Sequence, residues 1–156
     1  MEIRNAEIKD INKMTPLMLQ VAQLHFNARK DIFKEKSINL IEIELKNRFE
    51  DNENILVAED NENIVGILIY KIKEVEEHIN LKDRKILWID ELVVDEKIRG
   101  KGIGKRLFNK ASKIAKSQNC DAVELNCWNF NENAIRFYEK CGMIIQRRIM
   151  EIKVNV

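Results

Sequence analysis

The sequence predicts a mixed α/β fold, in which helices pack on the faces of a mixed sheet within one domain, residues 1–156. A length of 156 residues suits one domain, and 45% hydrophobic residues are enough to form a core without disulfides or metal. No linker, repeat or low-complexity tract divides the chain. Apolar residues switch between strand and helical spacing, which predicts elements in the order β, α, α, β, β, β, α, β, α, β.

The two helices that follow the first strand are both amphipathic. Apolar residues recur at helical spacing over 11–25, with Asp10 as the N-cap. Pro16 falls inside this pattern, so it either kinks the helix or begins a second segment. The next helix follows Ser37, and its apolar positions run over 38–49. Each helix therefore has an apolar stripe that can pack on a sheet.

Three strands come next along the chain. The runs "NILVAED" (54–60) and "NIVGILIYKIKEV" (63–75) are rich in β-branched residues. A tight turn at 61–63 joins the two runs, so we expect a hairpin. The run "ILWIDELVVD" (86–95) predicts the third strand, which leads directly into a glycine-rich segment.

The last third of the chain alternates between helices and strands. Helical spacing resumes over 103–115, and "DAVELNCW" (121–128) follows as a strand. Another helix begins near Asn131 and stops at Gly142, since glycine is the usual residue after a helix C-terminus. We expect the tail "MIIQRRIMEIKV" (143–154) to form the closing strand.

Charge and cysteine usage narrow the functional classes. Lys and Arg number 27 against 26 Asp and Glu, so the net charge of +1 gives no sign of a nucleic-acid or membrane partner. The cysteines, Cys120, Cys127 and Cys141, show no C-x-x-C spacing, which argues against a disulfide framework and a zinc site. No apolar run has the length of a signal sequence or a membrane span. We therefore expect a soluble cytoplasmic protein without a metal. His25 lies on the apolar stripe of the first helix, and we interpret it as a packed residue.

The run "VVDEKIRGKGIGKRLF" (93–108) places glycines at 100, 102 and 104 in a basic turn that opens a helix. Backbone N–H groups at a helix N-terminus bind anions, and glycine lets a phosphate approach the chain closely. A tight turn or close packing on the sheet would also select glycine. The spacing matches neither a P-loop nor a dinucleotide fingerprint, which disfavours ATP, GTP and a dinucleotide as the anion.

Two motifs resemble those of the GNAT superfamily of acetyl-CoA-dependent N-acetyltransferases. Arg99-x-x-Gly102-x-Gly104 after "LVV" resembles motif A of the family. The run "NENAIRFYEKCG" (131–142) resembles the helix that carries the family's asparagine and tyrosine. The order of elements agrees with the family fold over the whole chain, while motif-level resemblance covers about 89–143.

The resemblance implies acetyl-CoA as the cosubstrate. Amides of the glycine turn would hold the pyrophosphate, and the main chain of the preceding strand would bind the pantetheine arm where that strand loses its neighbour. The implied coenzyme-binding residues are Leu92, Val93, Val94, Arg99, Gly100, Lys101, Gly102, Ile103, Gly104, Lys105 and Asn131. Tyr138 would lie near the sulfur and act as the general acid. The alternatives are that Asn131 only caps a helix and that Tyr138 only packs in the core.

Asp90 and Glu91 are adjacent acids in an otherwise apolar strand. Neighbouring strand residues point to opposite faces, so at least one acid faces the interior. Either a bulge turns it into a cleft or a cation meets it; exposed acids at a strand end are the alternative. A primary amine has a pKa near ~10.4, so something must take its proton at neutral pH. Asp90 or Glu91, directly or through a water, is the candidate base, and polyamine-acetylating family members carry an acidic pair here.

Taken together, the resemblance implies transfer of acetyl from acetyl-CoA to a primary amine of a small, cationic acceptor, by direct attack in a ternary complex. A non-catalytic acyl-CoA-binding or sensing domain, a nucleotide-binding protein and a protein N-terminal or lysine acetyltransferase stay open. Asn126 disfavours the N-terminal class, because such enzymes often carry a glutamate base there. A short final segment leaves a homodimer open, in which a partner completes the acceptor wall. The acceptor, the acyl range and the oligomeric state do not follow from the sequence.

Overall fold

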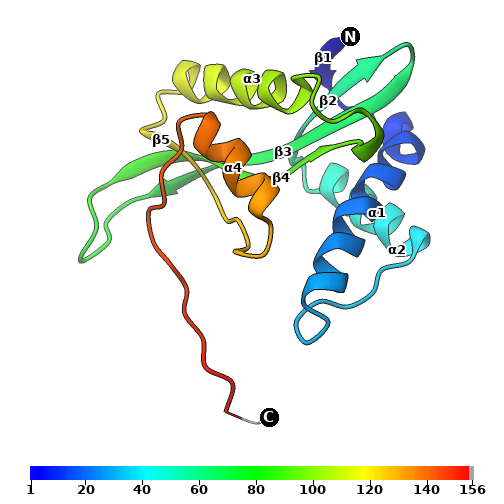
Figure 1. The fold of residues 1–156 in the computed structure, drawn as a ribbon. Coiled ribbons are helices and arrows are strands. Elements are labelled where there is room, and N and C mark those ends of the chain that lie inside the picture. The colour runs from blue at the N-terminus through cyan, green and yellow to red at the C-terminus, as the bar shows by residue number, and fades with distance from the viewer. Residues whose placement is uncertain (155–156) are drawn as a thin grey trace. The chain divides into compact units, whose positions relative to one another are not determined.

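The computed structural model describes residues 1–154 (Figure 1). Its helices and strands are, in chain order, β1 (Glu2–Asn5), α1 (Ile11–Ala28), α2 (Ile38–Glu50), β2 (Asn54–Asp60), β3 (Asn63–Val75), β4 (Arg84–Val94), α3 (Ile103–Ser117), β5 (Ala122–Leu125) and α4 (Glu132–Lys140).

The chain divides into two compact units, an N-terminal unit, Met1–Asn126, and a C-terminal unit that begins at Cys127. The organisation of 1–156 as one domain stays a prediction. None of the helices within 1–154 combines the length and the apolar character needed to cross a membrane.

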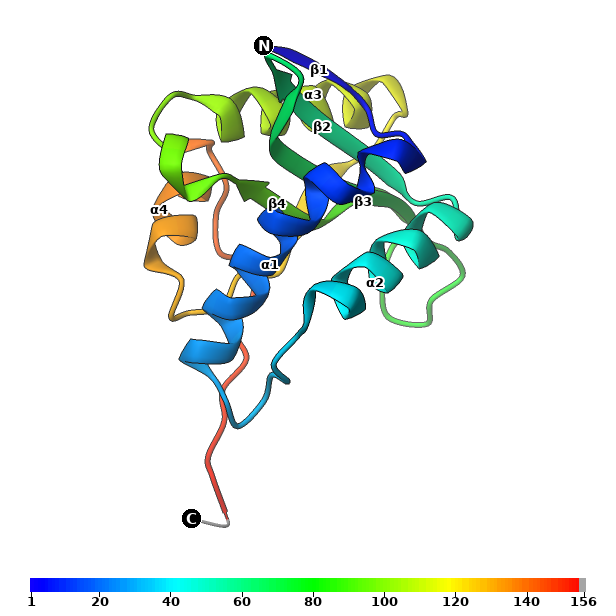
Figure 2. The same ribbon diagram turned by 90° about the vertical axis from the view of Figure 1, so that its right-hand side faces the viewer.

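The N-terminal unit contains a five-stranded mixed sheet in the order β1-β2-β3-β4-β5. The first four strands are antiparallel neighbours, and β5 runs parallel to β4. α1 and α2 cover one face of this sheet and α3 covers the other (Figures 1 and 2). The predicted mixed α/β class is confirmed.

The hairpin of β2 and β3 forms where the sequence predicts it. Asn61 and Glu62 have positive φ, as a two-residue hairpin turn requires. Side chains of β3 alternate between the faces of the sheet, and Ile67 and Ile69 join the core beneath α1 and α2. Gly66 faces α3, where an added β-carbon would lie 2.9 Å from Leu107 Cδ1, so a larger residue here would force that side chain to shift.

α2 begins as the sequence predicts, whereas Asp10 occupies the N-cap position of α1 but makes no capping hydrogen bond to it, because its carboxylate accepts from Arg4 and Glu7 N–H instead. α1 is continuous from Ile11 to Ala28, so Pro16 lies inside it and does not begin a second segment. The hydroxyl of Ser37 accepts a hydrogen bond from the Leu40 N–H at 3.3 Å, which confirms the N-cap of α2. Their buried apolar residues, Met14, Leu17, Met18, Ile41 and Leu45, pack into the core with β2 and β3. This packing fixes the space between the two helices above β4.

β4 contains an irregularity at the acidic pair. In its pairing with β3, Glu91 lies opposite Ile69 and Ile89 lies opposite Tyr70. Asp90 is therefore the extra residue of a β-bulge, one of the two arrangements that the sequence predicts for an acid here. Such a bulge bends the strand and redirects its side chains.

The C-terminal unit consists of α4 and the segments on either side of it. Asn131 caps the helix by accepting a hydrogen bond from Ala134 N–H at 3.2 Å. At the other end Gly142 has φ of +91°, its N–H donates to Glu139 O, and Met143 N–H donates to Tyr138 O. These bonds form a Schellman motif, so the predicted stop at Gly142 is confirmed.

The predicted closing strand at 143–154 is wrong. These residues form no strand, and the side chains of Ile144, Ile149 and Ile152 are 89%, 90% and 86% exposed. Apolar spacing shows which residues could fill a sheet position, but a strand also needs a neighbour to accept its backbone hydrogen bonds. The observed order within 1–154 therefore lacks the last β of the prediction, and β5 is shorter than the predicted strand over 121–128.

Candidate active site

The glycine-rich turn connects β4 to α3 through a short 3-10 helix, η2 (Glu96–Ile98). Gly100 and Gly102 have φ of +84° and +77°, a left-handed conformation that glycine adopts without strain. A β-carbon built at either residue would meet no atom within 4 Å. Close packing therefore does not explain these two glycines, and the backbone beside them is open to a ligand.

The N-terminus of α3 has the features of an anion site. The hydrogen bond from Arg106 N–H to Gly102 O, at 3.0 Å, is the first of the helical ladder. The N–H groups of 103–105 precede it, so no helical carbonyl is available to accept them. Lys101 and Lys105 are exposed and add positive charge to the same turn. Amides and lysines together can hold a pyrophosphate.

The C-terminal end of β4 has one unpaired edge. Leu92, Val93 and Val94 pair with β3 on one side. β5 pairs with β4 only over 86–89, so the other edge of 92–94 has no partner strand within the N-terminal unit. Arg99 donates through Nε to the Val94 carbonyl at 3.2 Å, which holds the turn against this strand end. The predicted loss of a neighbour is therefore present next to the glycine turn.

Asp90 is fully engaged by its surroundings. Its Oδ1 accepts from Trp88 Nε1 at 2.9 Å, and its Oδ2 lies 3.0 Å from Lys71 Nζ and 3.4 Å from Arg48 Nη1. Burial raises the pKa of Asp90, but the bonds and charges of Lys71 and Arg48 outweigh burial and hold the pKa below its ordinary value. Asp90 is thus an ionised carboxylate with its hydrogen-bonding capacity largely used.

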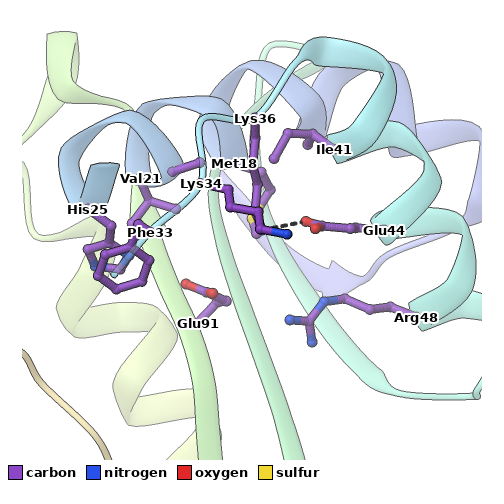
Figure 3. A pocket seen from close by; sticks show the side chains of 11 residues that line it. Met18, Val21, His25, Phe33, Lys34, Lys36, Ile41, Glu44, Arg48 and Glu91 are labelled. Atoms are coloured by element: carbon purple, nitrogen blue, oxygen red, sulfur yellow. Dashed lines mark hydrogen bonds and ion pairs between the residues drawn. The ribbon is translucent and has the colours of Figure 1, made fainter. Parts of the chain in front are cut away.

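Glu91 lies instead in a pocket between α1, the segment after it, α2 and β4 (Figure 3). The pocket has a volume of about 130 Å³. Its lining residues are Met18, Val21, Ala22, His25, Phe33, Lys34, Lys36, Ile41, Glu44, Arg48 and Glu91. All of them belong to the N-terminal unit, and Glu91 is the contribution of the sheet.

The carboxylate of Glu91 has no hydrogen bond or ion pair with any residue in 1–154. Its pKa is raised to about 7, mainly by burial, while the charge of Arg48 lowers it and the charge of Asp90 raises it. A carboxyl group with this pKa is ionised in about half of the molecules at neutral pH. Glu91 can therefore accept a proton and release it again under ordinary conditions.

The two walls of the pocket differ in character. One wall is apolar, and on it His25 stacks on Phe33 with ring centroids 5.0 Å apart. Burial lowers the pKa of His25, which keeps the imidazole neutral. The other wall is charged: Lys36 Nζ lies 2.8 Å from Glu44, and Arg48 extends from α2 towards Glu91 (Figure 3).

Sequence reasoning did not find Lys34, Lys36, Glu44 or Arg48 as site residues. They come from α2 and the segment before it, more than 40 positions from Glu91, and carry no motif. The contact of Arg48 with Asp90 appears only in the folded structure, so no sequence pattern indicated it. His25, interpreted as packed, does pack against Phe33, but it does so on the pocket wall.

Asn131 and Tyr138 belong to the C-terminal unit. Asn131 uses its side-chain oxygen to cap α4, as its alternative interpretation expects, and this leaves the amide nitrogen available. The ring of Tyr138 packs edge-on against Phe137 at 5.2 Å between centroids. Their coenzyme and acid roles stay predictions. Within 1–154 no cluster of three or more His, Cys, Asp or Glu side chains could hold a metal ion.

Comparison with known proteins shows similarity to N-acetyltransferases. The sequence model of the acetyltransferase (GNAT) family matches residues 19–143. An uncharacterized N-acetyltransferase of Methanocaldococcus jannaschii is 35% identical over 92 residues, which are 59% of this chain and 39% of the relative. The spermine/spermidine N(1)-acetyltransferase of Bacillus subtilis (strain 168) is 29% identical over 80 residues, 51% of each chain.

A solved structure resembles the whole chain. It is a mutant BH1408 protein of Bacillus halodurans, with a TM-score of 0.94, 30% sequence identity and coverage of 99% of this chain and 100% of that one. The two sequence relatives are longer than their matches, which span 39% and 51% of their lengths. The family match itself covers well over half of this chain. The chain therefore belongs to the acetyltransferase (GNAT) family.

Proposed function

We propose that this protein transfers an acetyl group from acetyl-CoA to the primary amine of a small acceptor, by direct attack in a ternary complex, with Glu91 as the general base. The acceptor enters as a cation because its amine is protonated at neutral pH. One observation carries the proposal: the Glu91 carboxylate, which has no partner among residues 1–154 and a pKa of about 7, lies in a pocket beside the strand that leads to the glycine turn.

The glycine turn supports acetyl-CoA as the donor. The positive φ of Gly100 and Gly102 and the open space beside them let the pyrophosphate approach the amides of 100–105. The unpaired edge of 92–94 offers main-chain groups to the pantetheine arm. When bound, acetyl-CoA supplies the acyl group on a thioester, and an amide of this edge can stabilise the oxyanion that forms during attack.

The two adjacent acids take different roles in this proposal. An amine with a pKa near ~10.4 is neutral at pH 7 in roughly one molecule in a few thousand, so removing its proton limits the attack. Glu91 has both the open carboxylate and the matched pKa to take that proton, directly or through a water. Asp90, held by Trp88, Lys71 and Arg48, is a positioning residue that fixes the bulge and thereby the direction of Glu91.

Collapse of the tetrahedral intermediate releases coenzyme A as a thiolate, which needs a proton. A phenol has a pKa near ~10 and stays protonated at pH 7. Tyr138 is our candidate for this general acid, and Asn131 for a hydrogen bond to the coenzyme; both follow from the family helix motif.

The test combines binding with turnover. We expect titration calorimetry to show acetyl-CoA and coenzyme A binding, and a panel of primary amines to produce amine-dependent thiol release. Binding without thiol release for any amine would identify an acyl-CoA-binding or sensing domain. Thermal stabilisation by ATP in preference to coenzyme A would instead identify a different phosphate ligand, because a ligand at 100 times its Kd adds roughly 2.7 kcal/mol.

A further inference from the structure

Arg48 and Glu91 line the same pocket but do not bond to each other. Arg48 extends from α2 and Glu91 from β4 (Figure 3), yet no hydrogen bond or ion pair joins them. Arg48 binds both Asp90 and Glu53 through one nitrogen, Nη1. Within 1–154 its Nε and Nη2 have no hydrogen-bond partner, and both nitrogens are accessible to solvent. A donor and an acceptor of opposite charge therefore face a cavity that separates them.

The other charged residues of the pocket make its lining mainly positive. Lys34 and Lys36 also line it, and Glu44, which pairs with Lys36, is the second acid beside Glu91. Once Glu91 has taken a proton, the lining holds three cations and one carboxylate. Although Asp90 and Glu53 offset part of the Arg48 charge, a second ammonium in the pocket would still face Arg48 and both lysines.

We propose that the acceptor carries an anionic group close to its reacting amine, with the amine at Glu91 and the anion at the free nitrogens of Arg48. The chemical class is a short amine with a carboxylate or phosphate, such as an aminocarboxylate. This inference rests on the proposed acetyl transfer. It keeps the reacting amine as the positive charge of the acceptor and adds a negative charge near it. The planar guanidinium suits such a group because it binds carboxylate and phosphate oxygens through two N–H groups.

The apolar wall fits the same class of acceptor. Met18, Val21 and Phe33 line the cavity beside Glu91, where a short methylene chain can lie. The cavity volume of about 130 Å³ suits a small molecule. An acceptor of this kind would satisfy the unpaired groups at both ends and leave no polar group against the apolar wall.

A purely structural role for Arg48 is the competing explanation, since Arg48 ties α2 to the bulge through Asp90. Lys71 provides the matched control. It also bonds to Asp90, at 3.0 Å, but it does not line the pocket. A change at Lys71 therefore disturbs the same carboxylate without removing a cation from the pocket.

The experiment measures kcat/KM by thiol release for amines of equal chain length: propylamine, 3-aminopropanoate, 3-aminopropyl phosphate and 1,3-diaminopropane. We expect the wild type to prefer an anionic member over both propylamine and the diamine. Arg48→Met should reduce the preference for the anionic member over propylamine by about tenfold to a hundredfold, the size expected for a charged hydrogen bond. Lys71→Met should leave that ratio unchanged. The carboxylate and phosphate members distinguish the two sources of the anion.

The outcomes separate this inference from the proposed function. If kcat/KM for the diamine or for propylamine equals or exceeds that for the anionic members, the inference is wrong and acetyl transfer stands. If no amine is acetylated although acetyl-CoA binds, the proposed function fails and this inference fails with it. An unchanged ratio in Arg48→Met would remove Arg48 from the anion site, and the wild-type panel decides the acceptor class even if that variant does not fold.

Discussion

Asp90 and Glu91 show how one backbone irregularity can give adjacent acids opposite properties. Without the bulge the two side chains would alternate across the sheet. With it, Asp90 meets a tryptophan N–H, a lysine and an arginine, and its pKa falls below the ordinary value. Glu91 meets no such partner in the described chain, and burial raises its pKa to about 7. The sequence narrowed the candidate base to this pair, and the hydrogen bonds around Asp90 favour Glu91 in that proposed role.

The raised pKa of Glu91 predicts a distinctive pH profile. The carboxylate form is the base, so kcat/KM of the wild type should rise as pH increases to about 7 and then level off. In Glu91→Gln only neutral amine can react, so the rate should be about 10²- to 10⁴-fold lower at pH 7 and should keep rising towards the amine pKa near ~10.4. Glu44→Gln, a change at the other pocket acid, is the control and should keep the wild-type plateau. A wild-type profile in Glu91→Gln would exclude Glu91 as the base.

The same group also links stability to pH. Between its ordinary pKa of 4.5 and the folded value of about 7, the folded protein binds more protons at Glu91 than the unfolded chain does. The contribution of Glu91 to the free energy of unfolding therefore falls as pH rises through this window. We expect Glu91→Gln to lose less stability than the wild type between pH 5 and 8 in denaturant titrations. Equal pH dependence in the two proteins would show that Glu91 titrates normally.

At the scale of elements, the turn between β4 and α3 combines an unusual backbone conformation with a proposed binding role. Gly100 and Gly102 need positive φ, and the space beside them is empty. Gly142, after α4, combines a φ of +91° with the same open space but has no predicted ligand. The chain thus contains an internal control for the cost of placing a side chain at positive φ.

We predict that Gly102→Ala weakens acetyl-CoA binding by roughly tenfold or more, because its β-carbon would meet the pyrophosphate and weaken charged hydrogen bonds. Gly142→Ala should pay a similar conformational cost, about 1–2 kcal/mol of stability, without a change in affinity. Titration calorimetry measures the affinities for acetyl-CoA, and thermal unfolding measures the loss of stability in each variant. If both variants bind acetyl-CoA as the wild type does, the glycines serve only the turn.

The elements themselves followed from the sequence where local signals decide them. Ser37, the 61–63 turn and Gly142 each act on neighbours within a few residues, and each was predicted correctly. The tail at 143–154 was wrong because a strand depends on a partner that its own residues do not specify. The pocket around Glu91 was missed for a related reason: it forms where α1, α2 and β4 meet, and Arg48 carries no motif that relates it to Glu91.

At the scale of the whole molecule, the residues of the proposed reaction are divided between the two compact units. The pocket around Glu91, the proposed base and the glycine turn all belong to the N-terminal unit, Met1–Asn126. Asn131 and Tyr138 belong to the C-terminal unit. The family model matches residues 19–143, which include parts of both units. Family membership therefore supports a function to which both units contribute residues. The proposed base and the proposed acid therefore come from different units and can be tested separately.

Replacement of Tyr138 by phenylalanine tests the contribution of the C-terminal unit. The change keeps the aromatic ring, and with it the edge-on contact to Phe137 at 5.2 Å, and removes only the hydroxyl. If the phenol protonates the coenzyme A thiolate, kcat should fall by about 10²- to 10⁴-fold while the Kd for acetyl-CoA stays close to the wild-type value. Phe137→Leu is the control, because it disturbs the same aromatic contact but leaves the hydroxyl of Tyr138 in place.

The two variants separate chemistry from packing in α4. Loss of kcat in Tyr138→Phe together with retained kcat in Phe137→Leu would assign the proton transfer to the phenol. Because the acid acts after the amine has been deprotonated, Tyr138→Phe should also keep the rise of kcat/KM with pH towards about 7 that Glu91 sets. Near wild-type kcat in Tyr138→Phe would make Tyr138 a packing residue of α4, and the thiolate would then have to leave unprotonated or take its proton from water.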